Sequence, residues 1–411
     1  MTNSQHHEIV VIGAGIAGAT IANELLERGQ SVCIVDAANS PANACSSHAY
    51  AIAHPHIGRG SPRLLRLTRI AFLMAEARWG KQWKQHGIFQ PTKKDKAFDR
   101  EELQKHLQAL DLDGDMAKPL DAAQARALLG VEQSGVWLPR GASLSLAKVA
   151  NDLLQKHEKL TCIWNTHIGR LESSNGRWLL FDDADQPIMS TQKVIVAAAM
   201  EAKALMASVD IRLPLKPVRG QLSIFSIAKN DPWAAQLPRV GISGDGYCLP
   251  AEELADGSHR WIVGSSFDEG EDDLESRESS DMFNREQAQG LLDYRQGDST
   301  SLKVADCFVG IRCVAGDRLP IIGALTQRPG IFLATALGSR GVLWSALAAK
   351  LISSQVLEDD FALLVRLGFA ADLVAALAPA RFFAGALAAP SALGALASNS
   401  KLIFPSDPKA K

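Results

Sequence analysis

Residues 8–36 read EIVVIGAGIAGATIANELLERGQSVCIVD, and this stretch decides the fold. EIVVI is a short apolar run that predicts a buried strand. The amphipathic segment after the glycines predicts a helix that ends at Gly29, and SVCIVD predicts a second strand. A strand, a glycine turn, a helix and a second strand within about 30 residues form one βαβ unit.

The turn inside this unit has the G-x-G-x-x-G spacing of a dinucleotide-binding site. Gly13 permits the tight turn, Gly15 lets the backbone approach a pyrophosphate, and Gly18 lets the helix pack closely on the strand. The free N–H groups and the positive dipole end of the helix attract the phosphates. Asp36 ends the second strand, where it can accept hydrogen bonds from ribose hydroxyls. The candidate cofactor-binding residues of this unit are Gly13, Ala14, Gly15, Ile16, Ala17, Gly18 and Asp36.

Composition excludes several classes of protein. The chain has 411 residues, 47% of them hydrophobic, which is enough for more than one compact unit. Its net charge of −2 provides no global field that attracts nucleic acid, so an RNA partner needs a local patch. Six scattered cysteines without a Cys-x-x-Cys pair argue against a zinc site. With no signal peptide and no run of about 20 apolar residues, we expect a cytoplasmic protein without a membrane span and without a metal.

The rest of the chain alternates helical and strand patterns. Residues 37–62 have the composition of a loop, and GVWLPRG at 135–141 predicts a strand and a turn. Helices are predicted at 62–86, 99–130, 144–157, 270–298 and after Gly341. Strands are predicted at LTCIW, THIGRLE, RWLLFDD, KVIVAAA and IFLATAL, and within the strand-rich stretch 217–267. The stretch 367–397 predicts pieces of soluble helix, and we expect the tail past Leu387 to be ordered only in part.

Arg312 lies in VGIRCVAGDRLPIIG, residues 309–323, between an apolar strand and a turn. A planar guanidinium at such a place can hold a carboxylate through two parallel hydrogen bonds. It can equally cap backbone carbonyls as a structural residue. The residues alone leave both interpretations open.

A second glycine-containing turn precedes a helix in LGSRGVLWSALAAKLIS, residues 337–353. Gly338 and Gly341 flank Ser339 and Arg340, so a helix N-terminus there can present N–H groups to a polar ring edge or a developing negative charge. An ordinary strand-to-helix turn accounts for the same pattern, and the residues alone favour it.

Three further patterns of residues can each be interpreted in two ways. In LPLKPVRGQLS, residues 213–223, Arg219 and Gln221 either line a substrate channel or lie on the surface of a crossover. His54 and His56 are interpreted as loop histidines against a cofactor, because no third metal ligand is evident. A charged run and a set of arginines either contact RNA phosphates or are solvated faces: residues 93–96, and Arg59, Arg63, Arg66 and Arg69.

These motifs, in this order, resemble the FAD-dependent D-amino-acid-oxidase-like superfamily, which includes glycine and sarcosine oxidases. Within it the chain is most similar to the FAD-dependent oxidoreductase half of the bifunctional tRNA 5-methylaminomethyl-2-thiouridine biosynthesis enzymes. The pieces that carry this resemblance are spread over residues 8–385, and GSSFDEGEDD and LGSRG are the most specific of them. We expect the chain to lack the methyltransferase half of those enzymes.

The resemblance implies an α/β fold of the glycine-oxidase type with an α+β substrate part. It consists of a discontinuous Rossmann-type FAD-binding domain and a mixed-sheet substrate domain. The implied FAD-binding domain comprises residues 1–60, 140–212 and 305–360. The implied substrate domain comprises residues 61–139 and 213–304, and residues 361–411 form a C-terminal helical segment with a partly ordered tail.

The resemblance also implies a reaction. Non-covalently bound FAD would oxidise the carboxymethylaminomethyl group of the wobble uridine in tRNA, giving 5-aminomethyluridine and glyoxylate. The implied catalytic residues are Arg312, which would bind the substrate carboxylate, with Ser339 and Arg340. The further implied cofactor-binding residues are Ser46, Ser47, Ile168, Ala197, Ala199 and Gly338 to Val342, that is Gly338, Ser339, Arg340, Gly341 and Val342. The implied partners are tRNA and a separate methyltransferase.

Two departures from the family pattern predict weaker FAD binding than in relatives. Ala199 stands where an A-x-G pattern has glycine, and SSHAYAIAHPH lacks the usual Gly or Asn. Two other functions are alternatives: a small-molecule oxidase for glycine, sarcosine or a D-amino acid, which shares the fold and chemistry, and a flavin-binding protein without catalysis, degenerate at Ala199. Cys313 lies near the cysteine to which some sarcosine oxidases attach flavin, but we expect no covalent bond here.

Overall fold

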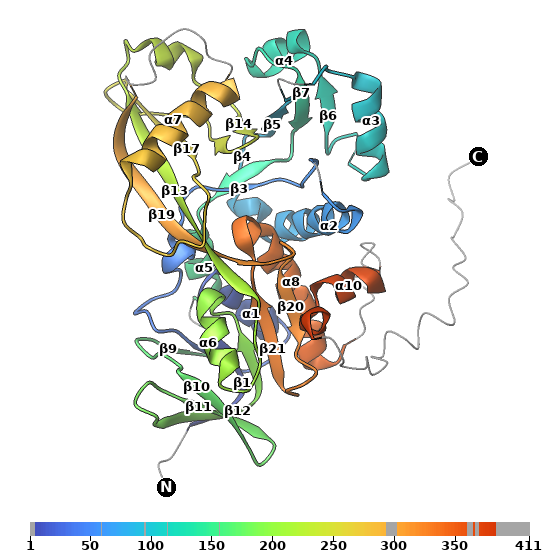
Figure 1. The fold of residues 1–411 in the computed structure, drawn as a ribbon, viewed down its shortest axis with the longest axis vertical. Helices are drawn as coiled ribbons and strands as arrows, with labels where there is room; N and C mark the ends of the chain where they lie inside the picture. The colour runs from blue at the N-terminus through green and yellow to red at the C-terminus, as the bar shows by residue number, and fades with distance from the viewer. Residues whose placement is uncertain are drawn as a thin grey trace, which may run out of the picture.

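The computed structural model describes residues 5–58, 60–93, 96–112, 114–155, 157–292, 302–359, 365 and 370–383. Two large sheets occupy opposite ends of an elongated molecule, with helices packed between them (Figure 1). Within these described residues, no helix combines the length and the apolar character needed to cross a membrane.

The first sheet has a parallel centre in the order β21-β12-β1-β2-β9. Antiparallel β20 pairs with β21, and the β10–β11 hairpin pairs with the first half of β12. The bounds are β1 (Gln5–Ile12), β2 (Val32–Val35), β9 (Leu160–Ile163), β10 (Arg170–Ser174), β11 (Arg177–Phe181), β12 (Pro187–Val196), β20 (Ile321–Ala324) and β21 (Ile331–Thr335).

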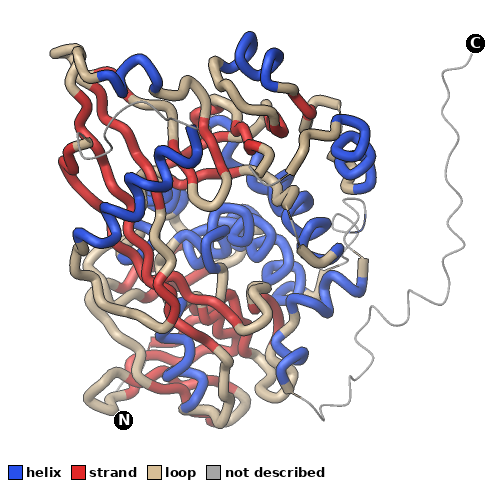
Figure 2. Tube along the Cα trace, turned by 45° about the horizontal axis from the view of Figure 1, so that its top comes forward, coloured by secondary structure: helices blue, strands red, loops and turns tan. Residues whose placement is uncertain are grey.

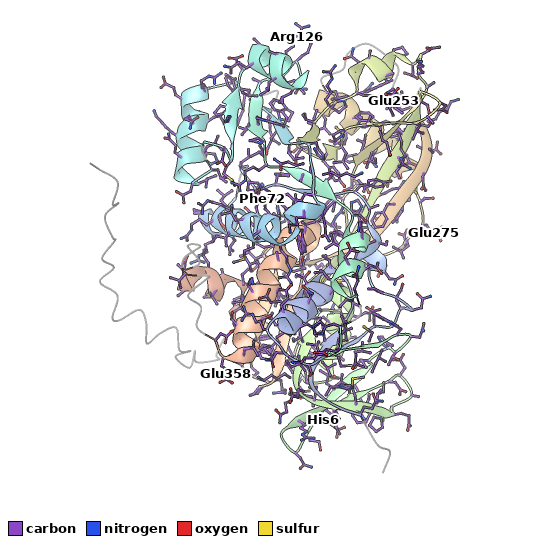
Figure 3. All side chains as sticks on the ribbon, turned by 180° about the vertical axis from the view of Figure 1, so that it is seen from behind. His6, Phe72, Arg126, Glu253, Glu275 and Glu358 are labelled. Atoms are coloured by element: carbon purple, nitrogen blue, oxygen red, sulfur yellow. The ribbon has the colours of Figure 1, made fainter. Side chains whose placement is uncertain are left out.

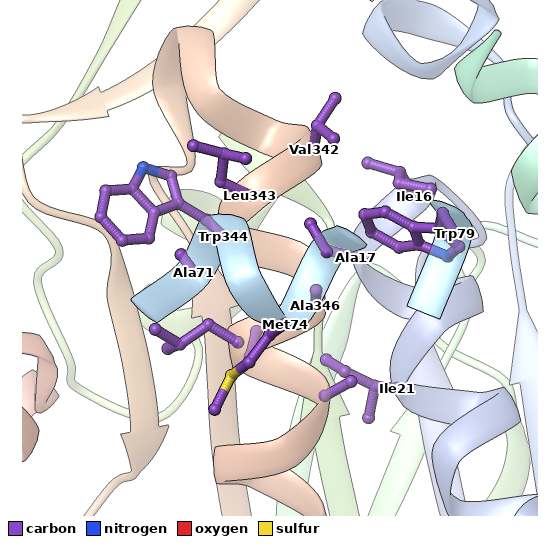
Figure 4. Packing of buried hydrophobic residues seen from close by; sticks show 14 of the residues in the cluster. Ile16, Ala17, Ile21, Ala71, Met74, Trp79, Val342, Leu343, Trp344 and Ala346 are labelled. Carbon is purple, nitrogen blue, oxygen red and sulfur yellow. The ribbon is translucent and has the colours of Figure 1, made fainter. Parts of the chain in front are cut away.

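Successive side chains of β1 pack in two separate cores, because alternate residues of a strand point to opposite faces of the sheet. Ile9 and Val11 pack against helices on one face, and Val10 and Ile12 pack on the other face. Figure 4 shows the first of these cores, where side chains of α1, α2 and α8 meet. The helices of that face are α1 (Ile16–Glu27), α2 (Pro62–Trp79), α5 (Leu146–Leu153) and α8 (Gly341–Leu357), and α6 (Ala202–Ala207) packs on the other face.

A buried carboxylate joins α1, α2 and α8. Glu24 is 2% exposed and accepts from Arg28 Nε at 2.9 Å, Arg78 Nη1 at 2.6 Å and Lys350 Nζ at 2.8 Å. Burial alone would raise the pKa of Glu24, but hydrogen bonds and charge from Lys350 and Arg78 outweigh it and lower the pKa. The helical layer therefore depends on one ionised side chain at its centre.

The second sheet has ten strands in the order β18-β13-β17-β15-β14-β5-β7-β6, with β19 on the other side of β13 and β16 beside β17. Helix α7 (Glu278–Leu292) packs on its strands β13, β15 and β17, and α3 (Arg100–Ala109) and α4 (Ala122–Leu129) lie beside β6 at the far end. The bounds are β5 (Ile88–Pro91), β6 (Lys118–Leu120), β7 (Gly135–Leu138), β13 (Leu215–Ile227), β14 (Gly241–Ser243), β15 (Tyr247–Cys248), β16 (Glu252–Glu253), β17 (His259–Gly264), β18 (Asp268–Glu269) and β19 (Lys303–Ala315).

The long antiparallel pair β13–β19 connects the two ends of the molecule (Figure 2). Leu215 of β13 packs in the core of the first sheet, and Phe225 of the same strand packs in the core of the second. A small sheet of β3 (Ala51–Ala53), β8 (Ala142–Leu144) and β4 (Lys84–Gln85) lies between the two large ones. The helix α10 (Ala371–Leu377) packs against α2 and β20.

The predicted Rossmann-type fold is confirmed, and so is the βαβ unit at 8–36. The helix predicted over 99–130 is wrong in its middle, because Asp111 and Gly114 adopt positive φ and β6 intervenes before Asp121 caps α4. The loop predicted at 37–62 contains β3 and a short helix, η1 (Ala44–Ser47). The helix predicted to reach residue 86 ends at Trp79. The domain boundaries stay a prediction, and 293–301 and the tail past Leu387 lie outside the described residues.

Candidate functional site

The predicted cofactor-binding residues gather at one edge of the first sheet. Gly13 follows β1, Asp36 follows β2, Ala197 follows β12, and Gly338 comes shortly after β21. Because these four strands are parallel, their carboxyl ends share one edge, which is where open α/β sheets bind ligands. A cavity of about 300 Å³ lined by His6 and Lys159 lies at the opposite ends of the strands (Figure 3 labels His6).

The glycine turn leaves no room for side chains. Gly13 has φ +100° and donates its N–H to Val35 O at 2.8 Å. A Cβ at Gly13 would lie 2.6 Å from Ala197 O, and one at Gly18 would overlap with Gly13 O. The turn is therefore as tight as the sequence predicted, and α1 begins directly after it at Ile16.

Two side chains shape the start of α1. Ser46 Oγ accepts from Ile16 N at 2.9 Å and caps the helix, and a Cβ at Gly15 would lie 3.0 Å from that oxygen. Asp36 is half-buried; its Oδ2 accepts from Ala14 N at 2.6 Å. Both predicted polar residues thus line the glycine turn.

The other predicted residues of this edge differ in exposure. Ser47 is exposed and donates to Ala44 O at 2.8 Å, within η1. The Ile168 side chain is 5% exposed and packs in the core, while Thr166 N, two residues earlier, donates to Asp36 O at 3.0 Å. The segment of Ile168 therefore runs beside Asp36.

Ala199 keeps the backbone conformation of a glycine. Its φ is +46°, it is exposed, and its carbonyl accepts from Thr335 Oγ1 at 2.9 Å. A left-handed conformation costs an L-residue roughly 1–2 kcal/mol. The loop after β12 has thus retained the glycine-like path although the glycine itself is replaced.

The predicted second turn is a short helix, η6 (Gly338–Arg340), directly before α8. Gly338 has φ +56°, and Ser339 is exposed. Arg340 is half-buried, and burial lowers the pKa of its guanidinium. A Cβ at Gly341 would lie 3.9 Å from Ile16 Cγ2, and Val342 packs in the core with α1. The turn therefore sits against the start of α1.

Three short helices from distant parts of the chain meet on β19: η1, η3 (Ala199–Glu201) and η6. Cys45 of η1 donates its thiol to Ile311 O at 2.9 Å, and burial raises the pKa of that thiol to about 11. The structure thereby brings Ser46, Ala199 and Gly338 to the strand that carries Arg312.

The Arg312 side chain crosses β13 above Gly220 to reach the segment between β17 and β18. Nη1 donates to Arg219 O at 3.2 Å and to Ser266 O at 3.3 Å, and Nη2 donates to Ser265 Oγ. These bonds use three of the five N–H donors of a guanidinium. The Nε–H and one Nη2–H have no partner among the described residues, and together they suit a bidentate carboxylate.

The charge of Arg312 is not neutralised within the described part of the chain. No ion pair there includes it, and the nearby Asp268 accepts from Arg219 Nη1 at 3.1 Å. Burial lowers the pKa of Arg312, but a guanidinium keeps its proton in proteins. A half-buried cation with two free donors is a place for an anionic group.

A neutral histidine adjoins this arginine. Tyr50 N donates to His48 Nδ1 at 3.1 Å, so the proton of the neutral ring is on Nε2, which donates to Tyr247 Oη at 3.1 Å. The Tyr247 hydroxyl in turn donates to Tyr50 O at 3.1 Å, and His48 stacks on Phe308 with centroids 4.9 Å apart. Burial, and then the charge of Arg312, lower the pKa of His48 to about 4. Burial raises the pKa of Tyr247, and the charge of Arg312 acts against that rise.

Several residues at this site carried no predicted role. They are Gly220, Ser265, Phe267, His48 and Tyr247. Ser265 and Phe267 belong to the GSSFDEGEDD piece, and the specificity of that piece was a signal that pointed to them. Neither interpretation of Arg219 and Gln221 is correct, because both are fully buried, beneath α7.

Within the described residues, the histidines, arginines and cysteine singled out in the sequence have partners elsewhere in the structure. His54 Nε2 lies 3.1 Å from Ser243 Oγ, and His56 N donates to Thr68 Oγ1 at 3.2 Å. Arg66 pairs with Asp372 at 2.8 Å, and Arg63 lies 3.9 Å from the same carboxylate. Arg69 donates to Asp111 O at 2.9 Å. Arg59 and residues 94–95 lie outside the described residues. Cys313 is 5% exposed, packs in the core of the first sheet and has its Sγ 3.5 Å from Thr335 Oγ1. Among described residues, no cluster of three His, Cys, Asp or Glu could hold a metal.

The edge of the first sheet fits the dinucleotide expected from the sequence. The absence of side chains at Gly13 and Gly18 keeps the turn and α1 close together, and a phosphate at the N-terminus of α1 would meet Ser46 Oγ, whose hydroxyl can donate a hydrogen bond to it. The Asp36 carboxylate stands beside that turn with lone pairs for ribose hydroxyls.

Comparison with known proteins also indicates a dinucleotide cofactor. A family model described as "FAD dependent oxidoreductase" matches residues 8–355. The chain is 32% identical over 413 residues to the tRNA 5-methylaminomethyl-2-thiouridine biosynthesis bifunctional protein MnmC of Ralstonia nicotianae, covering 92% of this chain and 60% of that protein. It is 30% identical over 418 residues to the protein of the same name from Burkholderia mallei, covering 94% and 61%. The chain thus spans about 60% of the length of these relatives.

Solved structures share the fold. Glycine oxidase from Geobacillus kaustophilus superimposes with a TM-score of 0.70 at 19% identity, covering 87% of this chain and 96% of that one. L-proline dehydrogenase from P. horikoshii gives 0.68 at 17% identity, covering 92% and 98%.

Proposed function

We propose, from the premise that this chain belongs to the family of FAD dependent oxidoreductases, that it oxidises the C–N bond of an N-substituted glycine. FAD is the cofactor of the family, and the core position of Cys313 supports non-covalent binding. The proposed holders are the glycine turn at 13–18, Asp36, Ser46, Ser47, Ile168, Ala197 and Ala199, and residues 338–342.

The proposed substrate is the carboxymethylaminomethyl group of the wobble uridine in tRNA. The relatives with 30–32% identity are named for biosynthesis of a 5-methylaminomethyl-2-thiouridine in tRNA, which supports this choice. The products would be 5-aminomethyluridine and glyoxylate. A separate methyltransferase is a further proposed partner, and a tRNA substrate would place the reaction in the cytoplasm.

The observation that carries the proposal is the free donor pair of Arg312. An N-substituted glycine has one carboxylate, and the Nε–H and Nη2–H of Arg312 can hold it bidentately. Binding there fixes the α-carbon of the substrate one bond from an anchored group.

The chain's own groups would orient the substrate and control protons. Bound FAD supplies the acceptor for the hydride that leaves the glycyl α-carbon. Arg312 would hold the carboxylate, and the Tyr247 hydroxyl, fixed by His48 and Tyr50, lies within the influence of the Arg312 charge. The substrate imine would then take up water and release glyoxylate. Ser339 and Arg340, at the turn before α8, are proposed to polarise the reacting groups.

A free N-substituted glycine such as sarcosine is a second candidate substrate. The arginines of the proposed RNA patch favour it, because Asp372 pairs with Arg66 and lies 3.9 Å from Arg63, which partly neutralises the charge that would attract a phosphate. The net charge of −2 points the same way.

Comparing the nucleosides of tRNA incubated with and without the protein tests the main proposal. Loss of 5-carboxymethylaminomethyluridine with formation of 5-aminomethyluridine supports it. Unchanged tRNA, together with hydrogen peroxide formed from sarcosine or glycine, contradicts it in favour of the second candidate. A flavin spectrum that bleaches anaerobically with an N-substituted glycine excludes a non-catalytic flavin-binding protein.

A further inference from the structure

Phe267 is a large apolar side chain that remains 49% exposed beside Arg312. The Arg312 Cζ lies over its ring, 5.5 Å from the centroid. Single exposed apolar residues are common on protein surfaces and carry no meaning by themselves. The position of this ring over the proposed carboxylate anchor is what makes it informative.

The segment that carries Phe267 is fixed on both sides. Ser266 N donates to Gln221 O at 3.1 Å, and Gln221 N donates to Ser266 Oγ at 3.0 Å. On the other side, Asp268 accepts from the fully buried Arg219 at 3.1 Å. The backbone of Phe267 is thus held while its ring stays at the surface, as a binding platform requires.

The linker of the proposed substrate is long enough to reach from Arg312 to the ring of Phe267. Four bonds separate the carboxyl carbon of a carboxymethylaminomethyl group from C5 of the uracil ring, which is about 5 Å in an extended conformation. A carboxylate bonded by the Nε–H and Nη2–H of Arg312 places its carbon roughly 4 Å from Cζ. The centroid of Phe267 lies 5.5 Å from the same Cζ, so a linker of about 5 Å is long enough for the pyrimidine to reach the ring. The methyl group of free sarcosine lies three bonds from its carboxyl carbon, and sarcosine has no ring that could stack.

We propose that Phe267 is the stacking platform for the pyrimidine ring of the substrate nucleotide, and hence the residue that distinguishes it from a free amino acid. This inference rests on the proposed function. Aromatic rings bind bases of any sequence by stacking, because every base has a π-face.

The charges around Phe267 agree with contact to a base and not to phosphates. The next residues are strongly acidic: Asp268, Glu269, Glu271, Asp272, Asp273 and Glu275. Three nearby arginines pair with some of these carboxylates: Arg219, Arg277 and Arg318. Three positive charges balance only part of the six negative ones. The sugar–phosphate chain would therefore leave on a path away from this segment.

The test compares Phe267→Leu and Phe267→Trp in the FAD-loaded enzyme. Leu keeps apolar cover over Arg312 without a π-face, and Trp restores one. We expect Phe267→Leu to raise KM and the calorimetric Kd for the nucleoside 5-carboxymethylaminomethyluridine on the order of 10-fold or more. Sarcosine oxidation should stay within about twofold, and Trp should recover nucleoside binding.

Phe98→Leu is the matched control. Phe98 also lies under an arginine, with Arg100 Cζ 5.7 Å from its centroid. Arg100, however, donates to Pro119 O in β6, at the far end of the ten-stranded sheet from β18. This variant should leave both substrates unaffected.

Three results would overturn the stacking role: an unchanged nucleoside Kd in Phe267→Leu, an equal loss with sarcosine, or an equal loss in Phe98→Leu. Failure of the proposed function looks different, because the wild-type enzyme would then leave the nucleoside chemically intact. In that case the calorimetric Kd values of the wild type and of Phe267→Leu still decide whether Phe267 stacks on the base. If the wild type shows no measurable binding of the nucleoside, both the stacking role and the proposed function are overturned.

Discussion

The guanidinium of Arg312 lies in the space that a side chain at Gly220 would fill. A Cβ at residue 220 would overlap with Cζ, Nη1 and Nη2 of that arginine. The two residues belong to the paired strands β13 and β19, with Gly220 opposite Gly310 and Arg312 opposite Val218. The missing side chain at residue 220 is therefore a condition for the path that Arg312 takes to Ser265 and Ser266.

Gly220→Ala should displace Arg312 and leave the fold intact, because the Cβ would meet the movable end of a side chain. We expect kcat/KM for the N-substituted glycine to fall on the order of 100-fold, as for a misplaced anchor. Steady-state kinetics and a flavin absorption spectrum check this. Gly290→Ala is the control, since nothing lies within 4 Å of its Cβ position in α7, and it should leave activity unchanged.

Arg312→Ala should retain FAD and lose substrate oxidation steeply, because the proposed carboxylate anchor is gone. Arg312→Lys should recover little activity, since an ammonium cannot provide two parallel donors. Titration of the flavin spectrum with a small carboxylate ligand should show weaker binding in both variants. Unaltered activity of Arg312→Ala would falsify the carboxylate role.

Stability should depend on pH through His48. Its folded pKa of about 4 is below the ordinary value of 6.5, so the unfolded chain binds more protons between these values. The stabilising contribution of neutral His48 is thus complete above about pH 6.5 and is lost as pH falls towards 4. Thermal melts of wild type and His48→Gln from pH 7.5 to 4.5 measure this. His54, whose pKa is also lowered to about 4, contributes in both proteins, so the difference between the melts isolates His48.

Ala199→Gly should tighten FAD binding with little change in stability. Glycine removes roughly 1–2 kcal/mol of left-handed strain but costs roughly 0.5–1 kcal/mol in chain entropy, so the two terms largely cancel. The FAD Kd, measured by fluorescence titration of the apoprotein, should fall several-fold because the loop after β12 loses a methyl group. Ala199→Val should act in the opposite direction, since β-branched residues rarely adopt positive φ. Equal Kd values in all three proteins would mean that residue 199 does not adjoin the cofactor.

Glu24→Gln should destabilise the protein by about 3 kcal/mol, because it leaves Arg28, Arg78 and Lys350 without their shared anion. Urea unfolding at pH 7 measures the loss. The lowered pKa of Glu24 also means that its contribution is present above the ordinary carboxyl pKa and disappears as pH falls through the folded value. Glu27→Gln, on the same helix but 58% exposed, should change stability by less than about 0.5 kcal/mol.

The sequence reveals the parts of the site that depend on local chemistry. Gly13, Gly18 and Asp36 are predictable because strand, turn and helix follow one another within one unit. Gly220 and Ser265 are not, because their relation to Arg312 arises from pairing across 45 or more residues. The break near Gly114 has a visible signal in Asp-Gly and in the capping box at Asp121, but helical periodicity on both sides obscures it.

The three short helices that meet on β19 come from residues 44–47, 199–201 and 338–340. During synthesis the first of them leaves the ribosome nearly 300 residues before the last. A nascent chain that stops before residue 340 lacks one wall of the proposed flavin site, so it cannot gain the stabilisation that a ligand bound there would give to the folded protein. Cofactor capture is therefore a late event, and the growing chain depends on its helical cores alone until translation is almost complete.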